Sequence, residues 1–389
     1  MFNGIEIDML SLGDADCILV TQWTNFGAFR VLIDGGKTSH AEAVIDFLIQ
    51  RGARSLYAVV CSHPHDDHAG GLIKLIQDPR LTICTAWMHD IRRHLPADAL
   101  RRASSGNSSE AESVKQVVET TKELSSAFVS RHVSPKEPFA GQIISCAPTL
   151  TVLGPTMSFY ESTLRAFTKV ESPIAFPLLP RRAAANPFGP SLYGLLTNSL
   201  LNNNESGSYI PVQAPVGWLA PPSQFSPFNR SPLLRGVLSN SSVKEKPATQ
   251  PFNNTSTVLG GLFSGMRLLF TADAGAESLD LIPAGWKNLM WMQIPHHGSD
   301  GNLSQKNIER FCPKFANIAA CGDLSHPSRA IVNGLIKVGA QVFSTHKGHL
   351  WFHSGSVPYR PDYPSVYATP LKPTGGLQTP LLWPAAPTG

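Results

Sequence analysis

The first third of the chain alternates short hydrophobic runs with segments of helical periodicity. Runs rich in Ile, Val, Leu and Phe predict strands at residues 4–10, 17–23, 29–34, 55–62, 81–88 and 147–156. Apolar positions recur at helical spacing in residues 40–52, 69–77 and 109–128. The run at 55–62 is almost continuously hydrophobic, as expected for a strand covered on both faces. Strands that alternate with helices in this way predict an α/β fold.

A second regular region begins near Thr255. Two β-rich runs flank a Ser-Gly turn and predict a hairpin at residues 255–263 and 266–275. Further strands are predicted at 288–299, 315–320, 340–345 and 349–353, with a helix at 328–339. The similar order of elements in the two regions suggests two similar α/β halves.

Between the two regions the composition changes. Residues 169–250 are rich in Pro, Asn and Ser and carry few charges, which indicates an insertion. A loop-rich lid over a site and a flexible excursion are both compatible with this composition. We therefore divide the chain into an N-terminal half at 1–168, the insertion at 169–250, a C-terminal half at 251–355 and a Pro-rich tail at 356–389.

Composition and charge narrow the class of protein. The net charge of +4 is only weak evidence for an anionic partner, because basic residues form short arginine pairs and no concentrated stripe. No run approaches the ~20 apolar residues of a membrane helix. The first residues include acids and lack a basic segment before an apolar run, so no signal peptide is predicted. The six cysteines lack CxxC spacing, and we expect buried free thiols in a cytoplasmic protein.

The most distinctive stretch is SHPHDDHAGG at residues 62–71. It places three histidines and two aspartates within six positions. Imidazole and carboxylate are ligands that suit Zn²⁺, Mn²⁺ or Fe. The cluster begins where a predicted strand ends and finishes where a helix begins, so several of its side chains can converge on one point. We interpret it as a metal site.

Other predicted strands also end in ligand-type residues. Asp34 ends a strand in VLID, Asp273 follows one in LLFTADAG, and His296 and His297 follow one in MQIPHHGS. A single aspartate at such a position is ordinary, because aspartate often caps a helix. Four strand ends that carry such residues together indicate a site built at one edge of a sheet.

In these residues the sequence resembles the metallo-β-lactamase superfamily. H-x-H-x-D-H follows a hydrophobic strand, an Asp-Gly turn precedes it, and a strand-end Asp and a late His come after it. Within the superfamily the sequence is most similar to the soluble domain of ComEC/Rec2-type DNA-uptake proteins, without their membrane part. The matching segments are LSLGDADCILV, LIDGG, SHPHDDHAGG, NNTSTVL, LLFTADAG, IPHHGSDGN, SHPS and GAQVFST. The resemblance implies a four-layer αββα sandwich with the metal site at the sheet edges.

The resemblance also implies a ligand set for two divalent ions, Zn²⁺ or Mn²⁺. The implied metal ligands are His63, His65, Asp67, His68, Asp273 and His296. The first two histidines and a late histidine would bind one ion, Asp67 and His68 the other, and Asp273 would bridge them. Asp34 would hold a ligand histidine by its other ring nitrogen. Of the late pair we favour His296 as the ligand and keep His297 as a candidate proton donor.

One segment departs from the family pattern. Many members carry a ligand histidine in a Gly-His turn after the strand that here reads LTVLGPT, but this chain has Gly154, Pro155 and Thr156 instead. Two alternatives follow: water fills the vacant position on the first ion, or Asn253 or another group near NNTS does.

The resemblance further implies a hydrolase. Two ions ~3.5–4 Å apart lower the pKa of a bridging water towards 7, so a metal-bridged hydroxide would be the nucleophile. Asp67 would orient this nucleophile or accept its proton. His297 and His326 are the candidate donors of a proton to the leaving group.

The substrate is less constrained than the chemistry. The ComEC-like segments and the mild positive charge favour a phosphodiesterase or nuclease that acts on nucleic acid or nucleotides. One alternative is a hydrolase of a small ester, lactone or lactam, with residues 169–250 as a lid over its pocket. Another is a metal-bearing binding or regulatory module of a DNA-handling or defence assembly.

Overall fold

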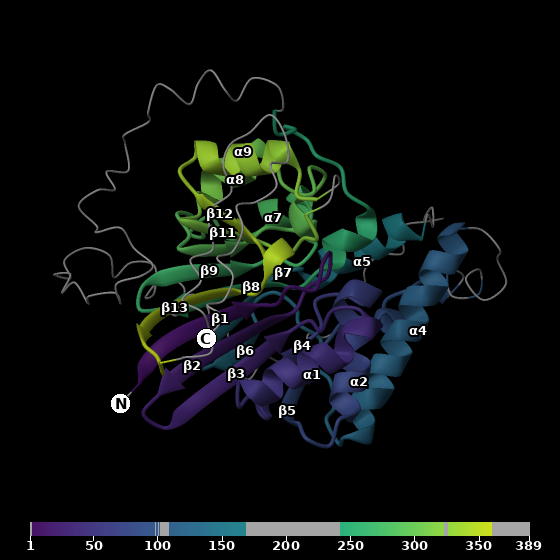
Figure 1. The fold of residues 1–389 in the computed structure, drawn as a ribbon. Helices are drawn as coiled ribbons and strands as arrows, with labels where there is room; N and C mark the ends of the chain where they lie inside the picture. Colours follow the sequence, from purple (N-terminus) through teal and green to yellow (C-terminus); the bar gives the residue numbers. More distant parts are fainter. Residues whose placement is uncertain are drawn as a thin grey trace, which may run out of the picture.

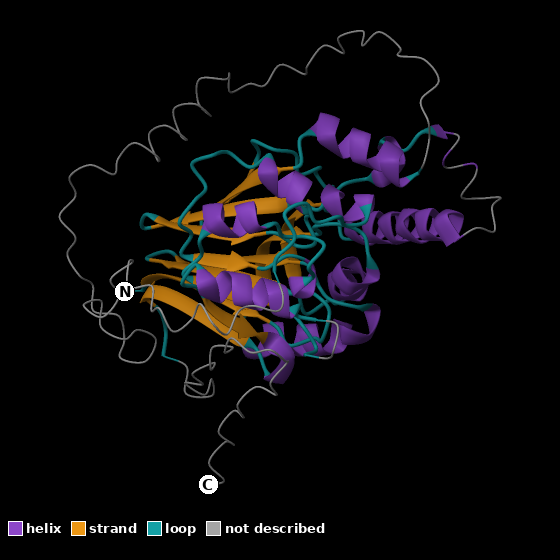
Figure 2. Ribbon diagram, turned by 90° about the horizontal axis from the view of Figure 1, so that it is seen from above, coloured by secondary structure: helices purple, strands orange, loops and turns teal. Residues whose placement is uncertain are grey.

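Two β-sheets face each other at the centre of the molecule, and helices lie on the outside of both. The computed structural model describes residues 2–97, 99, 101, 109–168, 242–322 and 326–359. Figure 1 shows the helices of the N-terminal part against one sheet and the later helices against the other, and Figure 2 shows the strands as the inner layers.

The first sheet is built mainly by the N-terminal part of the chain. Its strand order is β13-β1-β2-β3-β4-β5. The strands are β1 (Asn3–Met9), β2 (Ile18–Thr24), β3 (Gly27–Ile33), β4 (Ser55–Val60), β5 (Thr82–Trp87) and β13 (Leu350–Ser356). The pairs from β13 to β3 are antiparallel, and the pairs from β3 to β5 are parallel.

The second sheet has the order β12-β11-β10-β9-β8-β7-β6. Its strands are β6 (Ile143–Cys146), β7 (Thr149–Gly154), β8 (Val258–Phe263), β9 (Met266–Phe270), β10 (Trp291–Gln293), β11 (Phe315–Ile318) and β12 (Gln341–Ser344). The pairs from β6 to β9 are antiparallel, and those from β9 to β12 are parallel.

Helices cover the outer faces of the sheets and give the fold its four layers. The α-helices are α1 (Ala41–Gln50), α2 (Gly71–Gln77), α4 (Ser109–Ser130), α5 (Met157–Phe167), α7 (Ala276–Asp280), α8 (Gln305–Phe311) and α9 (Arg329–Lys337). Short helical turns are η1 (Thr38–His40), η2 (Asp66–Gly70), η3 (Ile91–Arg93), η6 (Pro251–Thr255), η7 (His296–Gly298) and η8 (Thr345–Lys347).

Three buried layers of apolar side chains hold the sandwich together. One layer lies between the first sheet and α1, α2 and α4. The second lies between the two sheets, and the third lies between the second sheet and α7, α8 and α9. Each sheet contributes side chains to a layer on each of its faces because successive residues of a strand point to opposite faces. In β1, Ile5 and Ile7 face the layer between the sheets, and Glu6 between them faces the other way.

The insertion does not mark the boundary between the segments that form the first sheet and those that form the second. Strands β6 and β7 precede the insertion but belong to the second sheet, and β13 returns from the end of the described chain to the edge of the first. Most of the proposed insertion and of the proposed Pro-rich tail lies outside the described residues. No helix of the described chain is long and apolar enough to cross a membrane.

The cysteines are only partly as expected. All six are free thiols, and Cys17 and Cys61 are buried. Cys84, Cys146 and Cys321 are exposed, so the prediction of burial is wrong for these three. For Cys84 the reason is strand alternation, because the buried Ile83 beside it takes the inward position on β5.

Candidate metal centre

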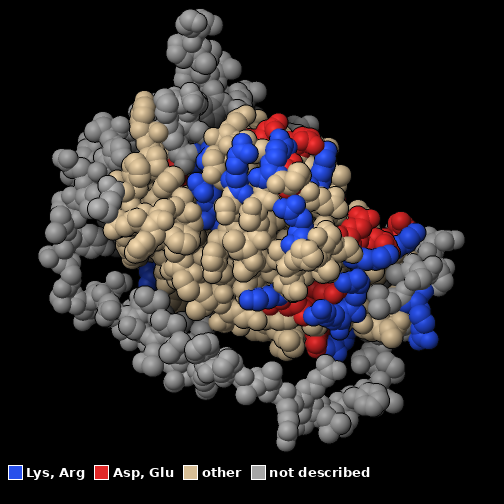
Figure 3. Space-filling view, turned by 90° about the horizontal axis from the view of Figure 1, so that it is seen from below, with Lys and Arg blue, Asp and Glu red and all other residues tan. Residues whose placement is uncertain are grey.

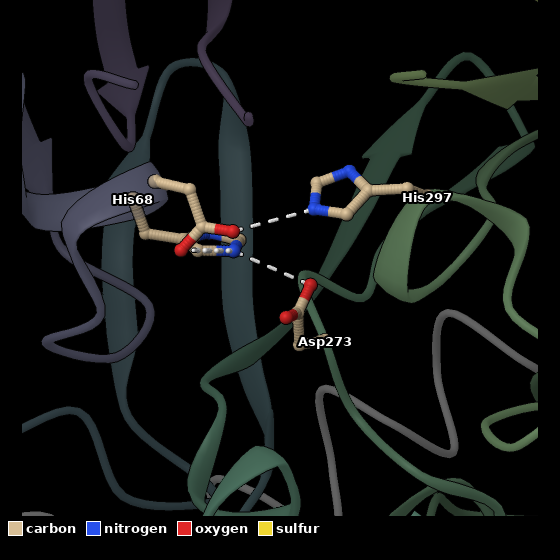
Figure 4. Close-up of side chains that lie close together, drawn as sticks. His68, Asp273 and His297 are labelled. Atoms are coloured by element: carbon tan, nitrogen blue, oxygen red, sulfur yellow. Dashed lines mark ion pairs between the residues drawn. The ribbon is translucent and has the colours of Figure 1, made fainter. Parts of the chain in front are cut away.

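The ligand-type residues gather where the parallel strands of both sheets end. Asp34 follows β3, the histidine cluster follows β4, Asp273 follows β9, and His296 and His297 follow β10. Because the two sheets face each other, the loops from their carboxyl ends meet at one edge of the sandwich. Figure 4 shows His68 on the side of the first sheet, with Asp273 and His297 pointing towards it from the second.

Four side chains form the first group, which we call the aspartate group. Its members are Asp67, His68, Asp273 and His297, whose ligand atoms lie within 4.8 Å of one another. His68 Nε2 lies 3.3 Å from Asp273 Oδ1, and His297 Nε2 lies 3.5 Å from Asp67 Oδ2. Figure 4 marks the ion pair between His68 and Asp273 with a dashed line.

The second group, which we call the histidine group, shares Asp273. It consists of His63, His65 and Asp273. His63 Nε2 lies 3.0 Å from His65 Nδ1 and 3.7 Å from Asp273 Oδ2. His296 Nε2 also lies 3.7 Å from Asp273 Oδ2. One carboxylate oxygen of Asp273 therefore faces each group, which is the geometry of a bridging ligand.

An unusual turn sends the two late histidines to different groups. His296 and His297 have φ angles of 49° and 55°, and Gly298 has a φ of 78°. Non-glycine residues rarely take this left-handed conformation, and residues in such sparsely populated backbone conformations cluster at active sites. His297 thus joins the aspartate group as a candidate ligand, a role that sequence reasoning did not assign to it, while His296 approaches Asp273 from the histidine group's side.

Hydrogen bonds fix which ring nitrogens face the centre. His68 Nδ1 lies 2.8 Å from Asp34 Oδ2, which is the kind of contact that the resemblance implies for Asp34. His297 Nδ1 lies 2.8 Å from the carbonyl oxygen of Ala319. Because each acceptor takes an N–H from Nδ1, the lone pair of each Nε2 is left to face the centre.

The other histidines are held in the same manner. His296 Nδ1 lies 2.9 Å from Asn302 Oδ1, and the amide nitrogen of Asn302 donates to the carbonyl oxygen of Asp273 at 2.7 Å. His63 Nδ1 lies 3.1 Å from Ser62 Oγ and 3.4 Å from Ser256 Oγ. These contacts are made by Nδ1, so Nε2 of His296 faces Asp273 and Nε2 of His63 faces His65 and Asp273.

Buried polar atoms that have no hydrogen-bond partner test whether an ion fits here. Among the described residues, His68 Nε2, His297 Nε2 and Asp273 Oδ1 are buried and have no hydrogen-bond partner. A buried polar atom without a partner is costly, by about 1–3 kcal/mol. All three belong to the aspartate group, and a divalent cation among them would satisfy all three at once. The residues present therefore fit the metal.

The pKa shifts also indicate that the carboxylates of the site are stabilised by positive charge. Burial raises the pKa of Asp273, but His68, His296 and His63 outweigh it and hold that pKa well below its ordinary value. Burial lowers the pKa of His68, but Asp273, Asp67 and Asp34 raise it well above its ordinary value. Without an ion, a proton on His68 supplies the positive charge that the surrounding carboxylates require.

Two predicted site residues lie away from the two groups. His326 Nδ1 lies 3.3 Å from Asp14 Oδ2, with its ring 5.9 Å from that of His296 and 6.0 Å from that of His297. Asn253 is buried, and its amide nitrogen donates to Thr249 Oγ1 at 3.1 Å. Neither residue belongs to a candidate metal group of the described chain.

Sequence reasoning missed the acidic residues of the β1–β2 loop. Asp16 is buried, which raises its pKa to about 7, and its Oδ2 lies 3.7 Å from His68 Nδ1. Together with Asp34 and His68 it forms a third acidic cluster. Asp14 accepts a hydrogen bond from the backbone N–H of Cys321 at 2.7 Å. The segment GDAD was the available signal, but it was used only as part of a family pattern.

The chain is similar to a known protein family and to solved structures. A family model of the metallo-beta-lactamase superfamily matches residues 11–137. Two crystal structures are similar: the metallo-beta-lactamase fold protein YhfI from Bacillus subtilis and a protein described as a new diphosphatase from the PhnP family. The first is 10% identical and covers 90% of this chain and 100% of that chain, with a TM-score of 0.41. The second is 9% identical and covers 91% and 100%, with a TM-score of 0.37. No curated protein matches the sequence.

The matched region contains Asp34 and the whole histidine cluster of residues 63–68. The architecture is that of the expected αββα sandwich, with two mixed sheets flanked by helices, and the predicted fold class is confirmed. Residues 11–137 thus match the metallo-beta-lactamase superfamily model, and they carry the candidate ligands that come from the first sheet.

Proposed function

We propose that this protein is a hydrolase that uses two divalent metal ions, with phosphodiesters as its substrates. The observation that carries the proposal is the pair of ligand groups on the two oxygens of Asp273. The buried atoms of the aspartate group that have no hydrogen-bond partner support it, because they are ligand atoms that a cation would satisfy.

Each side chain has a role in this proposal. His63, His65 and His296 would hold one ion with Asp273 Oδ2, and the aspartate group would hold the other through Asp273 Oδ1. The ions would supply Lewis acidity and lower the pKa of bound water. Asp67 lies at the less buried side of its group, where it would orient the attacking water.

His326 is the proposed donor of a proton to the leaving group. It is partly exposed beside the late histidines, and the carboxylate of Asp14 lies against its Nδ1. This contact would orient the imidazole ring of His326. Removal of either residue should slow reactions with poor leaving groups more than reactions with good ones.

The substrate class rests on the sequence. The segments that resemble ComEC/Rec2-type domains favour phosphodiesters, whether in nucleic acid or in nucleotides. On the face seen in Figure 3, Lys and Arg are interleaved with Asp and Glu, and no continuous basic stripe crosses the described residues of that face. Small diesters should therefore be tested beside DNA and RNA.

The decisive experiment compares substrates on protein stripped of metal and reloaded with Mn²⁺ or Zn²⁺. The substrates are bis-p-nitrophenyl phosphate, labelled single- and double-stranded DNA, RNA, and a p-nitrophenyl ester with a lactone and a β-lactam. Asp67→Asn and Asp273→Asn remove ligand charges, and Asp46→Asn on the exposed face of α1 is the matched control.

The outcomes separate the three hypotheses. Metal-dependent cleavage of phosphodiesters that is lost in both site variants and kept in the control supports the proposal. Cleavage of the ester, lactone or β-lactam alone would replace it with the small-molecule hydrolase. Two bound ions with no turnover of any substrate would favour the binding or regulatory module.

A further inference from the structure

We propose that the hydrogen bond between Asp16 and Gln293 sets the distance between the two sides of the aspartate group and thereby its affinity for an ion. The proposal rests on the proposed function, because it presupposes an ion in that group. It makes Asp16 and Gln293 positioning residues, since neither belongs to the aspartate group itself.

On the first sheet, Asp16 contacts the loops that carry ligands. Its backbone N–H donates to the carbonyl oxygen of Asp67 at 3.0 Å, and its own carbonyl accepts from the N–H of Gly36 at 2.8 Å. Its Oδ2 lies 3.7 Å from His68 Nδ1. Asp16 is thus fixed to the histidine cluster and to the turn after Asp34.

On the second sheet, Gln293 contacts the loop of Asp273. Its Oε1 accepts from the N–H groups of Thr271 and Ala272 at 3.0 and 3.2 Å. Thr271 Oγ1 donates to the carbonyl oxygen of Gln293 at 2.9 Å. The amide of Gln293 therefore holds the two peptide groups that come just before Asp273.

A single hydrogen bond joins these two sets of contacts. Gln293 Nε2 donates to Asp16 Oδ2 at 2.8 Å, and both side chains are buried. The bond links the loop between β1 and β2 of the first sheet to the end of β10 in the second sheet, and the two residues are far apart in the sequence. Because metal geometry tolerates errors of only about 0.2 Å in ligand distance, this bridge should matter for ion affinity.

The structure predicts that the effect is selective. The contacts of Asp16 and Gln293 lead to Asp67, His68 and Asp273. His63, in contrast, is held by Ser62 and Ser256. Asp273 belongs to both groups, but the contacts of Asp16 and Gln293 reach three of the four members of the aspartate group and only this one member of the histidine group. Loss of the bridge should therefore weaken binding to the aspartate group more than binding to the histidine group.

The test is a calorimetric titration of metal-free protein with Mn²⁺ alone. Gln293→Glu places a second carboxylate against Asp16 and keeps the acceptor for Thr271 and Ala272. We expect one of the two ions to bind about ten- to a hundredfold more weakly, the range found when groups that orient metal ligands are lost. Gln77→Glu at the exposed end of α2 is the charge-matched control.

Rescue distinguishes positioning from a general structural effect. In the double variant Asp16→Asn with Gln293→Glu, the new amide donates to the new carboxylate and restores the bond with its direction reversed. We expect the affinity of the weakened ion to recover to within about threefold, together with the Mn–Mn coupling in the electron paramagnetic resonance spectrum. Equal weakening of both ions in Gln293→Glu, or no rescue, overturns the proposal.

A second pair of variants serves if Gln293→Glu does not fold. Asp16→Asn keeps an oxygen that accepts from Gln293, whereas Asp16→Ala removes it. Weak binding of one ion in the alanine variant alone supports the proposal, and equal affinities overturn it. Wild-type protein that binds two ions and cleaves substrate while all variants behave alike would refute only this inference, whereas wild-type protein without bound ions would refute the proposed function as well.

Discussion

Single residues decide how the late histidines are used. His296 and His297 are neighbours in the sequence, yet their left-handed backbone directs one Nε2 towards Asp273 Oδ2 and the other towards Asp67. No residue-type pattern reveals this division, because it depends on φ angles that these residue types seldom adopt. The turn therefore makes both late histidines candidate ligands, where the sequence favoured His296 alone.

Substitution of each late histidine should affect a different ion. We expect His297→Ala to weaken the ion of the aspartate group, and His296→Ala the ion of the histidine group, each by at least about tenfold. Titration of the metal-free variants with Mn²⁺ measures both affinities. Loss of the same ion in both variants would contradict the division.

The glycine that closes this turn should be hard to replace. Gly298 and Gly265 both have a φ of 78°, but a Cβ on Gly298 would lie 2.8 Å from Pro327 Cβ, while a Cβ on Gly265 would meet nothing within 4 Å. Gly265→Ala should cost about 1 kcal/mol of unfolding free energy from backbone strain. Gly298→Ala should cost about 1–3 kcal/mol more from the clash.

Chemical denaturation of both glycine variants gives the comparison. Because the two positions share the same φ, the difference between them isolates the contact with Pro327. Equal losses would mean that the turn moves to accommodate a methyl group.

At the scale of elements, the loop after β5 buries a histidine in neutral form. His89 stacks on Tyr160 with ring centroids 4.3 Å apart, and neither of its ring nitrogens has a hydrogen-bond partner. Burial, with a smaller effect of His94, lowers its pKa to about 3. The loop therefore contains a base that the folded protein keeps unprotonated far below its ordinary pKa.

This burial should make the protein acid-sensitive. Between the pKa of His89 in the unfolded chain, about 6.5, and its pKa in the folded protein, His89 binds a proton in the unfolded chain but not in the folded protein. Stability should thus fall as the pH drops through this window, by about 2 kcal/mol between pH 7 and pH 5. His89→Phe keeps an aromatic ring and should remove this loss, as urea denaturation at both pH values would show. A pH dependence unchanged in the variant would exclude His89 as the cause.

At the scale of elements, the sequence predicted the positions of helices and strands better than it predicted the contacts between them. Most predicted strands and the helices at α1, α4 and α9 lie where the hydrophobic pattern placed them, because alternation and helical spacing are local properties. The helix α5 and the short elements β6, α7 and α8 were not predicted. Strand β7 joins the second sheet and β13 joins the first, and a hydrogen bond connects Asp16 to Gln293. These features depend on contacts between segments that are distant in the sequence, and no local pattern encodes them.

At the scale of the whole molecule, the candidate centre joins the two sheets. Asp67 and His68 belong to loops of the first sheet, and Asp273 and His297 to loops of the second. An ion held by all four would act as a crosslink between the halves of the sandwich. Metal binding and the stability of the fold should therefore be coupled.

Metal loading should raise the temperature of unfolding. A ligand at a hundredfold excess over its Kd stabilises the folded state by about 2.7 kcal/mol. We expect the midpoint of thermal unfolding to rise with Mn²⁺ concentration and to return on addition of a chelator. Asp273→Asn should lose most of this rise. A midpoint insensitive to metal in the wild-type protein would argue against ion binding between the sheets.

The return of β13 to the first sheet bears on how the protein is made. Asn3 pairs with Ser356, so β1 leaves the ribosome long before the strand that covers its edge has been synthesised. Until then, the unpaired N–H and C=O groups of β1 can pair with another nascent chain. Synthesis from the N-terminus thus keeps one edge of the first sheet open until β13 (Leu350–Ser356) has been made, and a premature stop before Leu350 would release a chain with that edge permanently uncovered.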